Sequence, residues 1–295
     1  MISRCAKNWI KSALLSFLFV SPLFPGPVWS KDNPSRIVSI GGSVTEIIYA
    51  LGQQHRLIAR DSTSLHPTEV LALPDVGYIR RLSPEGVLSV NPDLIVTLEG
   101  AGPPEAIEIL RAARVKLAAI PERYDGEGIA LKVDAVGAAL GAEQGAARIA
   151  KQIRKEAASL RRRTQAISRK KRVLFVLSMA GGKVLASGTQ TAAHGIIEMA
   201  GGTNAITAFP GYKALSDEAI ITAAPDVILM MKRRGNHGVA DEALKNHPVL
   251  SATPAVKNNA IIRKDGLYLL GFGPRGVQAA RDLSDRLYPG KPITR

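Results

Sequence analysis

The segment LPDVGYIRRLSPEGVLSVNPDLIV, residues 73–96, decides how the chain is organised. It opens as a loop that carries Tyr78, because proline, aspartate and glycine interrupt any regular element there. Ser83 and Pro84 have the residue types favoured at the N-cap and first position of a helix. That helix must end before Pro92, since a residue preceding proline disfavours helical geometry. The apolar, β-branched run that follows predicts a buried strand.

The second part of this segment recurs later in the chain. LSPEGVLSVNPDLIV, residues 82–96, aligns with LSDEAIITAAPDVIL, residues 215–229, at a constant offset of 133, and six of the fifteen pairs are identical. Gly77-Tyr78 has a near-partner in Gly211-Tyr212, one residue out of register. A single repeat of this size indicates two similar lobes, because a solenoid needs three or more units.

The first thirty residues are typical of an export signal. Basic residues precede an apolar run at residues 13–20, which is too short to span a bilayer. Val28 and Ser30 place modest or small residues at the −3 and −1 positions of a signal-peptidase site, so we expect cleavage after Ser30 and a periplasmic location. An uncleaved anchor is the alternative, disfavoured by the prolines that follow the run. Cys5 is the only cysteine, so the mature chain would have no thiol.

The order of the remaining elements predicts an α/β protein. Strand-like runs alternate with amphipathic helices, which favours two similar lobes, each a mostly parallel sheet flanked by helices. Residues 143–168 are free of proline, rich in arginine and lysine, and apolar at helical spacing, which predicts one long helix joining the lobes. An ordinary surface helix is the simpler alternative. We expect a signal peptide at 1–30, an N-terminal lobe at 31–142, a connecting helix at 143–170 and a C-terminal lobe at 171–295.

The charge balance favours an anionic partner. The whole chain has a net charge of +14, and loss of the three basic and no acidic residues of positions 1–30 leaves +11. Nucleic acid, a membrane surface and a carboxylate-bearing ligand all fit such a chain. Export argues against nucleic acid, and only 5% of the residues are aromatic, with no basic stripe suited to base stacking.

The sequence carries no recognisable catalytic motif, so we expect a binding protein with no catalytic residues. It has no G-x-S-x-G, no H-E-x-x-H and no P-loop, and Gly41-Gly42-Ser43 lacks the lysine that a phosphate-binding loop needs. The five histidines are scattered without the spacing of metal ligands.

Three segments form a specific combination: SIGGSVTEIIYALG (39–52), LPDVGYIRRLSPEGVLSVNPDLI (73–95) and GLYLLGFGPR (266–275). They resemble the periplasmic binding proteins that deliver iron chelates and cobalamin to ABC importers, and more narrowly the haem-binding members. The resemblance implies that the chain carries haem b to an inner-membrane ABC permease with its ATPase, downstream of an outer-membrane haem receptor system. A ferric-siderophore or cobalamin carrier of the same fold is the alternative.

The resemblance also implies that Tyr78 is the axial ligand of the haem iron. Ferric iron is a hard cation and phenolate a hard anionic oxygen, so the pair is chemically suitable. A free phenol has a pKa of about 10, so the metal and a nearby guanidinium must favour the deprotonated form. Arg80, two residues further on, is expected to hydrogen-bond the phenolate oxygen. Without the resemblance, Tyr78 would be interpreted as a surface-loop tyrosine.

Other residues are expected around the ligand. Arg234 follows the second-lobe strand equivalent to residues 94–98, and we expect it, ahead of Arg81, to contact a propionate or the phenolate. Some relatives carry a haem-ligating histidine where this chain has Met179, so a stacked second haem is not predicted. Methionine and aromatic side chains suit an adaptable apolar wall. The expected lining residues are Met179, Met231, Tyr212 and Phe272.

Glu85 and Glu218 occupy matching positions in the first turns of the two repeated helices. Complementation of the helix dipole accounts for both without any partner. In the family that the chain resembles, one such surface glutamate per lobe docks on arginines of the permease, so we expect these two residues to form the permease contacts.

Overall fold

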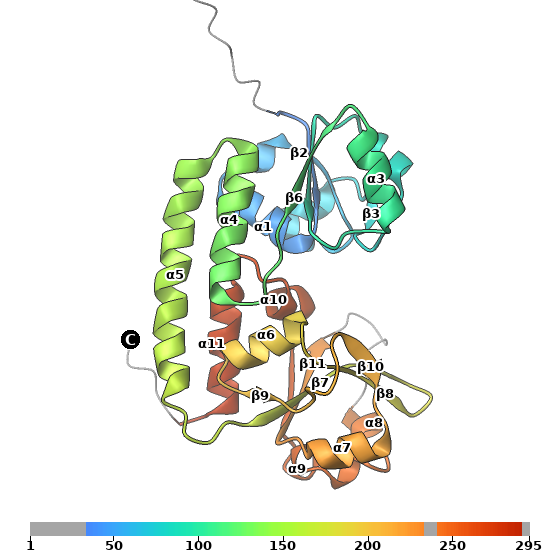
Figure 1. Cartoon of the computed structure of the whole chain (residues 1–295), viewed down its shortest axis with the longest axis vertical. Helices are drawn as coiled ribbons and strands as arrows, with labels where there is room; N and C mark the ends of the chain where they lie inside the picture. Colours follow the sequence, from blue (N-terminus) through green and yellow to red (C-terminus); the bar gives the residue numbers. More distant parts are fainter. Residues whose placement is uncertain (1–33, 233–240, 291–295) are drawn as a thin grey trace, which may run out of the picture. The chain divides into compact units, whose positions relative to one another are not determined.

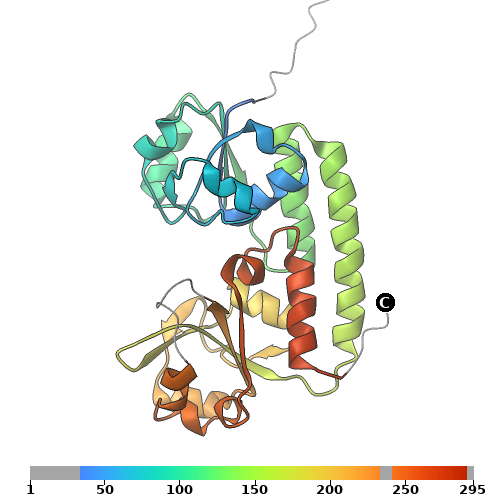
Figure 2. The ribbon, with the colours of Figure 1, turned by 180° about the vertical axis from the view of Figure 1, so that it is seen from behind.

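The computed structural model describes residues 34–232 and 241–290 (Figures 1 and 2). The predicted signal peptide, residues 1–30, and Arg234 lie outside the described residues. Within these two ranges, no helix is both long enough and apolar enough to cross a membrane.

The first sheet is fully parallel, with strand order β2-β1-β5-β6. Its strands are β1 (Ile37–Ile40), β2 (Leu57–Arg60), β5 (Leu94–Leu98) and β6 (Lys116–Ile120). Apolar side chains of α1 (Gly42–Ala50) and α4 (Gly126–Leu140) pack on one face, and those of α2 (Pro84–Leu88) and α3 (Pro104–Ala112) pack on the other. Short elements complete this part: η1 (Gln54–Arg56), η2 (Thr68–Ala72), β3 (Gly77–Tyr78) and β4 (Arg81–Leu82).

The second sheet is mixed, with strand order β10-β8-β7-β11-β12 and β9 beside β7. Strands β7, β11 and β12 run parallel, whereas β8 is antiparallel to β7 and β10. The strands are β7 (Arg172–Ala180), β8 (Lys183–Ser187), β9 (Thr203–Asn204), β10 (Tyr212–Ala214), β11 (Val227–Lys232) and β12 (Ile261–Asp265). The helices are α6 (Ala192–Met199), α7 (Asp217–Ala223), α8 (Asp241–Lys245), α9 (Pro254–Lys257), α10 (Gly266–Leu270) and α11 (Gly276–Leu287), with η4 (Leu250–Ala252) before α9.

The sequence repeat corresponds to a repeated structural unit. Each copy is a short helix followed by a strand, α2 with β5 and α7 with β11. The aspartate that follows the proline of the repeat, Asp93 or Asp226, makes the same type of hydrogen bond in both copies. The Asp93 carboxylate accepts the backbone N–H of Arg36 at 3.0 and 3.1 Å, and the Asp226 carboxylate accepts that of Arg172 at 2.8 Å. Each carboxylate therefore ties the repeated unit to the start of a central strand of its own sheet.

The predicted long helix is α5 (Glu143–Gln165), a single helix of 23 residues and about 35 Å. It lies beside α4, and α11 packs beside its C-terminal part (Figure 1). Its buried side chains join a core cluster that also holds residues of both sheets. The α/β architecture is thus confirmed, while the exact lobe boundaries at 142 and 170 stay a prediction, because one core serves both sheets.

Glycine allows α4 and α5 to approach closely. A Cβ atom on Gly137 would lie 2.2 Å from the Cβ of Ala146 in α5, far inside van der Waals contact. We therefore expect Gly137→Val to lower the free energy of unfolding in urea by about 1–3 kcal/mol, the usual cost of overpacking.

The matched control is Gly145→Ala within α5. The nearest atom to a Cβ there would be 3.4 Å away, and alanine is the better helix former by roughly 1 kcal/mol. This variant should keep or slightly raise stability. Equal effects of the two substitutions would contradict the close approach of the helices.

Candidate ligand cleft

A cavity of about 530 Å³ opens at the carboxyl ends of β1, β5 and β11. This is the edge at which open α/β sheets bind their ligands. Its wall comes from both halves of the chain. The first half contributes the turn after β1, the loop after β2, the β3–β4 hairpin and the link after β6, and the second contributes β10, β11, α10 and the start of α6.

Tyr78 reaches this cavity from the β3–β4 hairpin and is 49% exposed. Gly77 before it has a φ of 104°, a left-handed geometry suited to glycine, with open space where a side chain would project. The hairpin is anchored from below, because the Gly77 N–H donates to Asp75 at 2.8 Å and the Gly77 carbonyl accepts the N–H of Ser62 at 2.9 Å. The backbone is therefore fixed while the phenol remains uncovered.

The two arginines near Tyr78 have different surroundings. Arg80 lines the cavity and is exposed. Arg81 faces Tyr78 across the two-stranded hairpin, is also exposed, and is absent from the cavity wall. Of the two arginines, Arg80 thus lies beside the cavity with Tyr78, and Arg81 lies outside its wall.

The lining residues expected in the second half of the chain divide into two groups. Tyr212 and Met231 line the cavity. Met179 instead packs against the second core cluster, on the part of β7 that pairs with β8. Phe272 is only 1% exposed and lies beneath the cavity wall. In this structure Met179 and Phe272 do not line the cavity: Met179 is partly buried against the second core cluster, and Phe272 is buried behind Tyr124.

Aromatic pairs support the cavity wall from behind. The Tyr124 ring lines the cavity and meets the edge of Phe272 at a centroid distance of 5.3 Å, and Tyr212 meets Phe175 at 6.4 Å. Burial raises the pKa of Tyr124 and of Tyr212 above the usual value for a phenol. These two side chains are therefore neutral phenols at physiological pH.

Asp61, which the sequence analysis did not single out, organises the loops at the first-half wall. Its fully buried carboxylate accepts the backbone N–H of Gly41 at 2.9 Å, the N–H of Thr63 at 3.0 Å and the hydroxyl of Ser64 at 2.6 Å. Such charge-assisted bonds are stronger than neutral ones. The aspartate directly follows β2, at the strand end where ligand-side loops begin. This position is the only feature of the sequence that indicates its contact with those loops.

A buried ion pair forms part of the floor. The Lys132 Nζ, on α4 and with no exposed surface, lies 2.6 Å from the Oε1 of Glu122, which lines the cavity. The ammonium also donates to the Ser43 hydroxyl at 3.3 Å and to the Gly271 carbonyl at 3.4 Å. Burial raises the pKa of Glu122 and lowers that of Lys132, and each charge opposes the shift of the other. No sequence motif marks this pair, because only the packing of α4 beneath the cavity buries the lysine and brings it to Glu122.

A second polar link joins α1 to the segment before α11. The Arg275 guanidinium donates to both carboxylate oxygens of Glu46, at 2.9 and 2.6 Å, and stacks on the Tyr268 ring at 5.2 Å. Glu46 is almost fully buried. Glu46 belongs to the segment 39–52 and Arg275 to the segment 266–275, so the contact joins two of the three segments that carry the family resemblance.

Glu85 and Glu218 have closely similar surroundings, and both are exposed. Each follows a serine N-cap, Ser83 or Ser216, whose hydroxyl accepts a backbone N–H at 3.2 Å. The Ser83 hydroxyl lowers the pKa of Glu85, and the backbone N–H of Glu218 itself lowers that of Glu218. Both carboxylates thus stay ionised at the surface.

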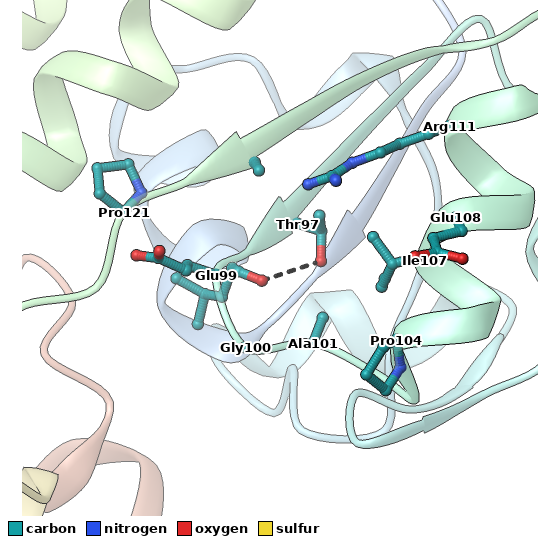
Figure 3. A pocket seen from close by; sticks show the side chains of 11 residues that line it. Thr97, Glu99, Gly100, Ala101, Pro104, Ile107, Glu108, Arg111 and Pro121 are labelled. Atoms are coloured by element: carbon teal, nitrogen blue, oxygen red, sulfur yellow. Dashed lines mark hydrogen bonds between the residues drawn. The ribbon is translucent and has the colours of Figure 1, made fainter.

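A further cavity of about 370 Å³ lies between β5, β6 and α3 (Figure 3). The Thr97 hydroxyl donates to the Leu98 carbonyl at 3.3 Å, so it is already occupied. Glu99, Glu108 and Arg111 are the charged lining residues and are exposed. No buried, unpaired polar group points into this cavity from the described residues, and none of the expected ligand residues lines it.

Comparison with known proteins identifies clear relatives. Residues 37–266 match the model of a family described as periplasmic binding protein. The structure of periplasmic heme-binding protein BhuT in complex with two hemes is 36% identical, with a TM-score of 0.80, covering 86% of this chain and 99% of that chain. The structure of RhuT from Roseiflexus sp. RS-1, a periplasmic heme-binding protein in apo form, is 38% identical, with a TM-score of 0.81. The match covers 86% of this chain and 98% of that chain. An uncharacterized ABC transporter substrate-binding lipoprotein of Bacillus subtilis, YvrC, is 25% identical over 262 residues, covering 88% of this chain and 82% of that protein.

Removing one charge of the buried Lys132–Glu122 pair should destabilise the fold more than removing both charges. Lys132→Met leaves Glu122 without its partner, and we expect urea denaturation to show a loss of about 3–5 kcal/mol. The double variant Lys132→Met/Glu122→Gln removes both charges and should regain most of that stability. Exposed Lys257→Met, the control, should change stability by less than about 0.5 kcal/mol. Additive losses in the double variant would refute the coupling.

Proposed function

Because this chain belongs to the periplasmic binding protein family, we propose that it captures haem in the cleft and delivers it to an inner-membrane ABC permease. Members of the family are substrate-binding proteins, so the chain is a binding protein and not an enzyme. The proposed location is the periplasm, with residues 1–30 removed after Ser30.

The observation that carries the proposal is the position of Tyr78 in the cavity wall, half exposed and on a hairpin whose backbone is anchored. In this proposal its phenolate is the ligand of the ferric iron of the cargo, a hard oxygen donor for a hard cation. Arg80, which lines the same cavity, supplies the positive charge that favours the phenolate.

The remainder of the wall suits a flat, mostly apolar ligand with a few charged groups. Leu65, Ile79, Leu98, Met231 and Leu267 offer apolar surface. In this proposal Arg80 and Arg234 also attract the haem propionates, with Arg81 at the edge. Tyr212 and Tyr124 offer aromatic faces to the porphyrin.

Two observations, one on similar proteins and one on this chain, support haem over the alternative cargoes. BhuT and RhuT, at 36% and 38% identity over nearly all of their length, are heme-binding proteins. A ferric siderophore or cobalamin would need no tyrosinate, so the exposure of Tyr78 favours haem. We propose no second haem ligand at Met179, which stands where some relatives carry a ligating histidine and is partly buried against the second core cluster.

Hemin titration tests the proposed cargo. The purified chain should develop a Soret band and the spectrum of a tyrosinate-ligated ferric haem, and should bind neither cyanocobalamin nor ferric siderophores with comparable affinity. Tyr78→Phe should abolish the tyrosinate spectrum. Haem affinity should fall by at least about tenfold. Mutation of residues that only support a metal site already costs roughly 10–100-fold in metal affinity.

Tyr49→Phe is the matched control, since Tyr49 lies on α1 outside the cavity wall. It should bind hemin as the original chain does. An unchanged tyrosinate spectrum in Tyr78→Phe would remove the ligand assignment, and tight binding of cyanocobalamin alone would replace haem as the cargo.

Delivery is tested through the proposed permease contacts. The double charge reversal Glu85→Lys/Glu218→Lys should abolish haem uptake by cells that depend on this chain, while hemin titration of the purified variant stays normal. Glu105→Lys/Glu242→Lys reverses exposed first-turn acids of α3 and α8, one in each half, and should leave uptake unchanged. Equal loss of uptake in both double variants would reject specific docking by Glu85 and Glu218.

A further inference from the structure

The positive charge of the chain is concentrated in one segment. Residues 148–172 hold eleven basic residues and one acidic residue, a net charge of +10. The other 270 residues hold 28 basic and 24 acidic residues, a net charge of only +4. The segment covers most of α5 and the turn into β7. An asymmetry of this kind points to an extended anionic partner.

Four of these cations form a stripe on the outward face of α5, which we call the basic ridge: Arg148, Lys151, Lys155 and Arg162. Their spacings of three, four and seven residues place them on one side of the helix. All four are exposed, whereas the buried residues of α5 lie on the opposite side. From end to end the ridge is about 21 Å long, at about 1.5 Å per residue.

The charges of the basic ridge are not neutralised by ion pairs among the described residues. Arg154 and Arg163, on the flanks of α5, form ion pairs with Glu127, Asp134 and Asp285. Within the described ranges, the four ridge residues form no ion pair. The exposed triplet Arg169, Lys170 and Lys171 continues the same charge beyond the end of the helix.

Stabilisation of the helix itself does not account for the ridge. The helix dipole favours cations only in the last turn, which explains Arg162 and not Arg148, Lys151 or Lys155. Ion pairs along the helix do not explain it either, because Glu156, the one acid of the segment, is hydrogen-bonded to Gln152 at 2.6 Å. The ridge is therefore free to meet an anionic partner outside the chain.

We propose that the basic ridge binds the anionic phospholipid headgroups of a membrane surface. A straight, exposed row of cations can meet a flat anionic surface at every position at once, and the attraction fades beyond a Debye length of about 8 Å at physiological salt. Each lysine or arginine near such a surface strengthens binding roughly fivefold. No large exposed apolar side chain lies on α5, so the contact is peripheral, without insertion into the bilayer.

The ridge and the candidate cleft are separate surfaces. No residue of α5 lines the cleft cavity. A chain held by its ridge therefore keeps the cavity accessible, and lipid binding does not depend on which cargo the cavity takes. The inference thus stands even if the proposed haem function fails.

Vesicle sedimentation tests this inference. Mature chain purified from a periplasmic extract should sediment with phosphatidylglycerol-containing vesicles, stay in solution with pure phosphatidylcholine vesicles, and be released near 1 M salt, where the Debye length is about 3 Å. The variant Arg148→Gln/Lys151→Gln/Lys155→Gln/Arg162→Gln keeps good helix formers and should bind several hundredfold more weakly, at roughly fivefold for each charge.

The control variant removes the same charge elsewhere: Arg111→Gln/Arg114→Gln/Lys245→Gln/Lys257→Gln, all at exposed positions. It should bind the anionic vesicles within about threefold of the original chain, since long-range attraction is largely screened. Equal weakening in both variants would show an effect of net charge alone and overturn the ridge. Displacement from vesicles by duplex DNA at matched phosphate concentration would identify a general polyanion site and overturn the assignment to lipid. Hemin titration and helix content by circular dichroism should be the same in all three proteins.

Discussion

The floor of the cleft depends on a single buried ammonium group. Lys132 binds the Glu122 carboxylate, the Ser43 hydroxyl and the Gly271 carbonyl, three groups from segments far apart in the chain that all line the cavity. A charge without exposed surface is costly unless it is paired, so the segments must stay where the ammonium can reach them. The Arg275–Glu46 contact acts on neighbouring segments in the same way. Together these two links keep α1 and the α10–α11 segment in contact.

The internal repeat gives the two halves a common plan, and the cleft arises from their differences. Asp93 and Asp226 tie each repeated unit to its own sheet through the same type of bond. Tyr212 lies one residue out of register with Tyr78 in the repeat and belongs to β10, where it packs against Phe175, whereas Tyr78 projects from a hairpin. Burial raises the pKa of Tyr212. The two tyrosines therefore reach the same cavity from differently built segments of the two halves.

The parts that were predictable from sequence are local ones. The serine caps, the breaks at proline and the long helix follow from residue types at short spacing, and α2, α7 and α5 formed where those signals lie. The parts that were not predictable depend on contacts between distant segments. The Asp61 bond to Gly41, the bonds of Lys132 to Ser43 and Gly271, and the burial of Phe272 belong to this class, because exposure and pairing are set by packing that a motif does not contain.

The half-exposed phenol of Tyr78 has a kinetic consequence. The side chain is 49% exposed in the cavity wall, so under the proposed function an arriving haem meets it without displacement of a covering segment. Filling of the empty protein would then be limited by diffusional encounter. Discrimination between ligands would follow from how long each stays bound, and release would fall to the proposed permease.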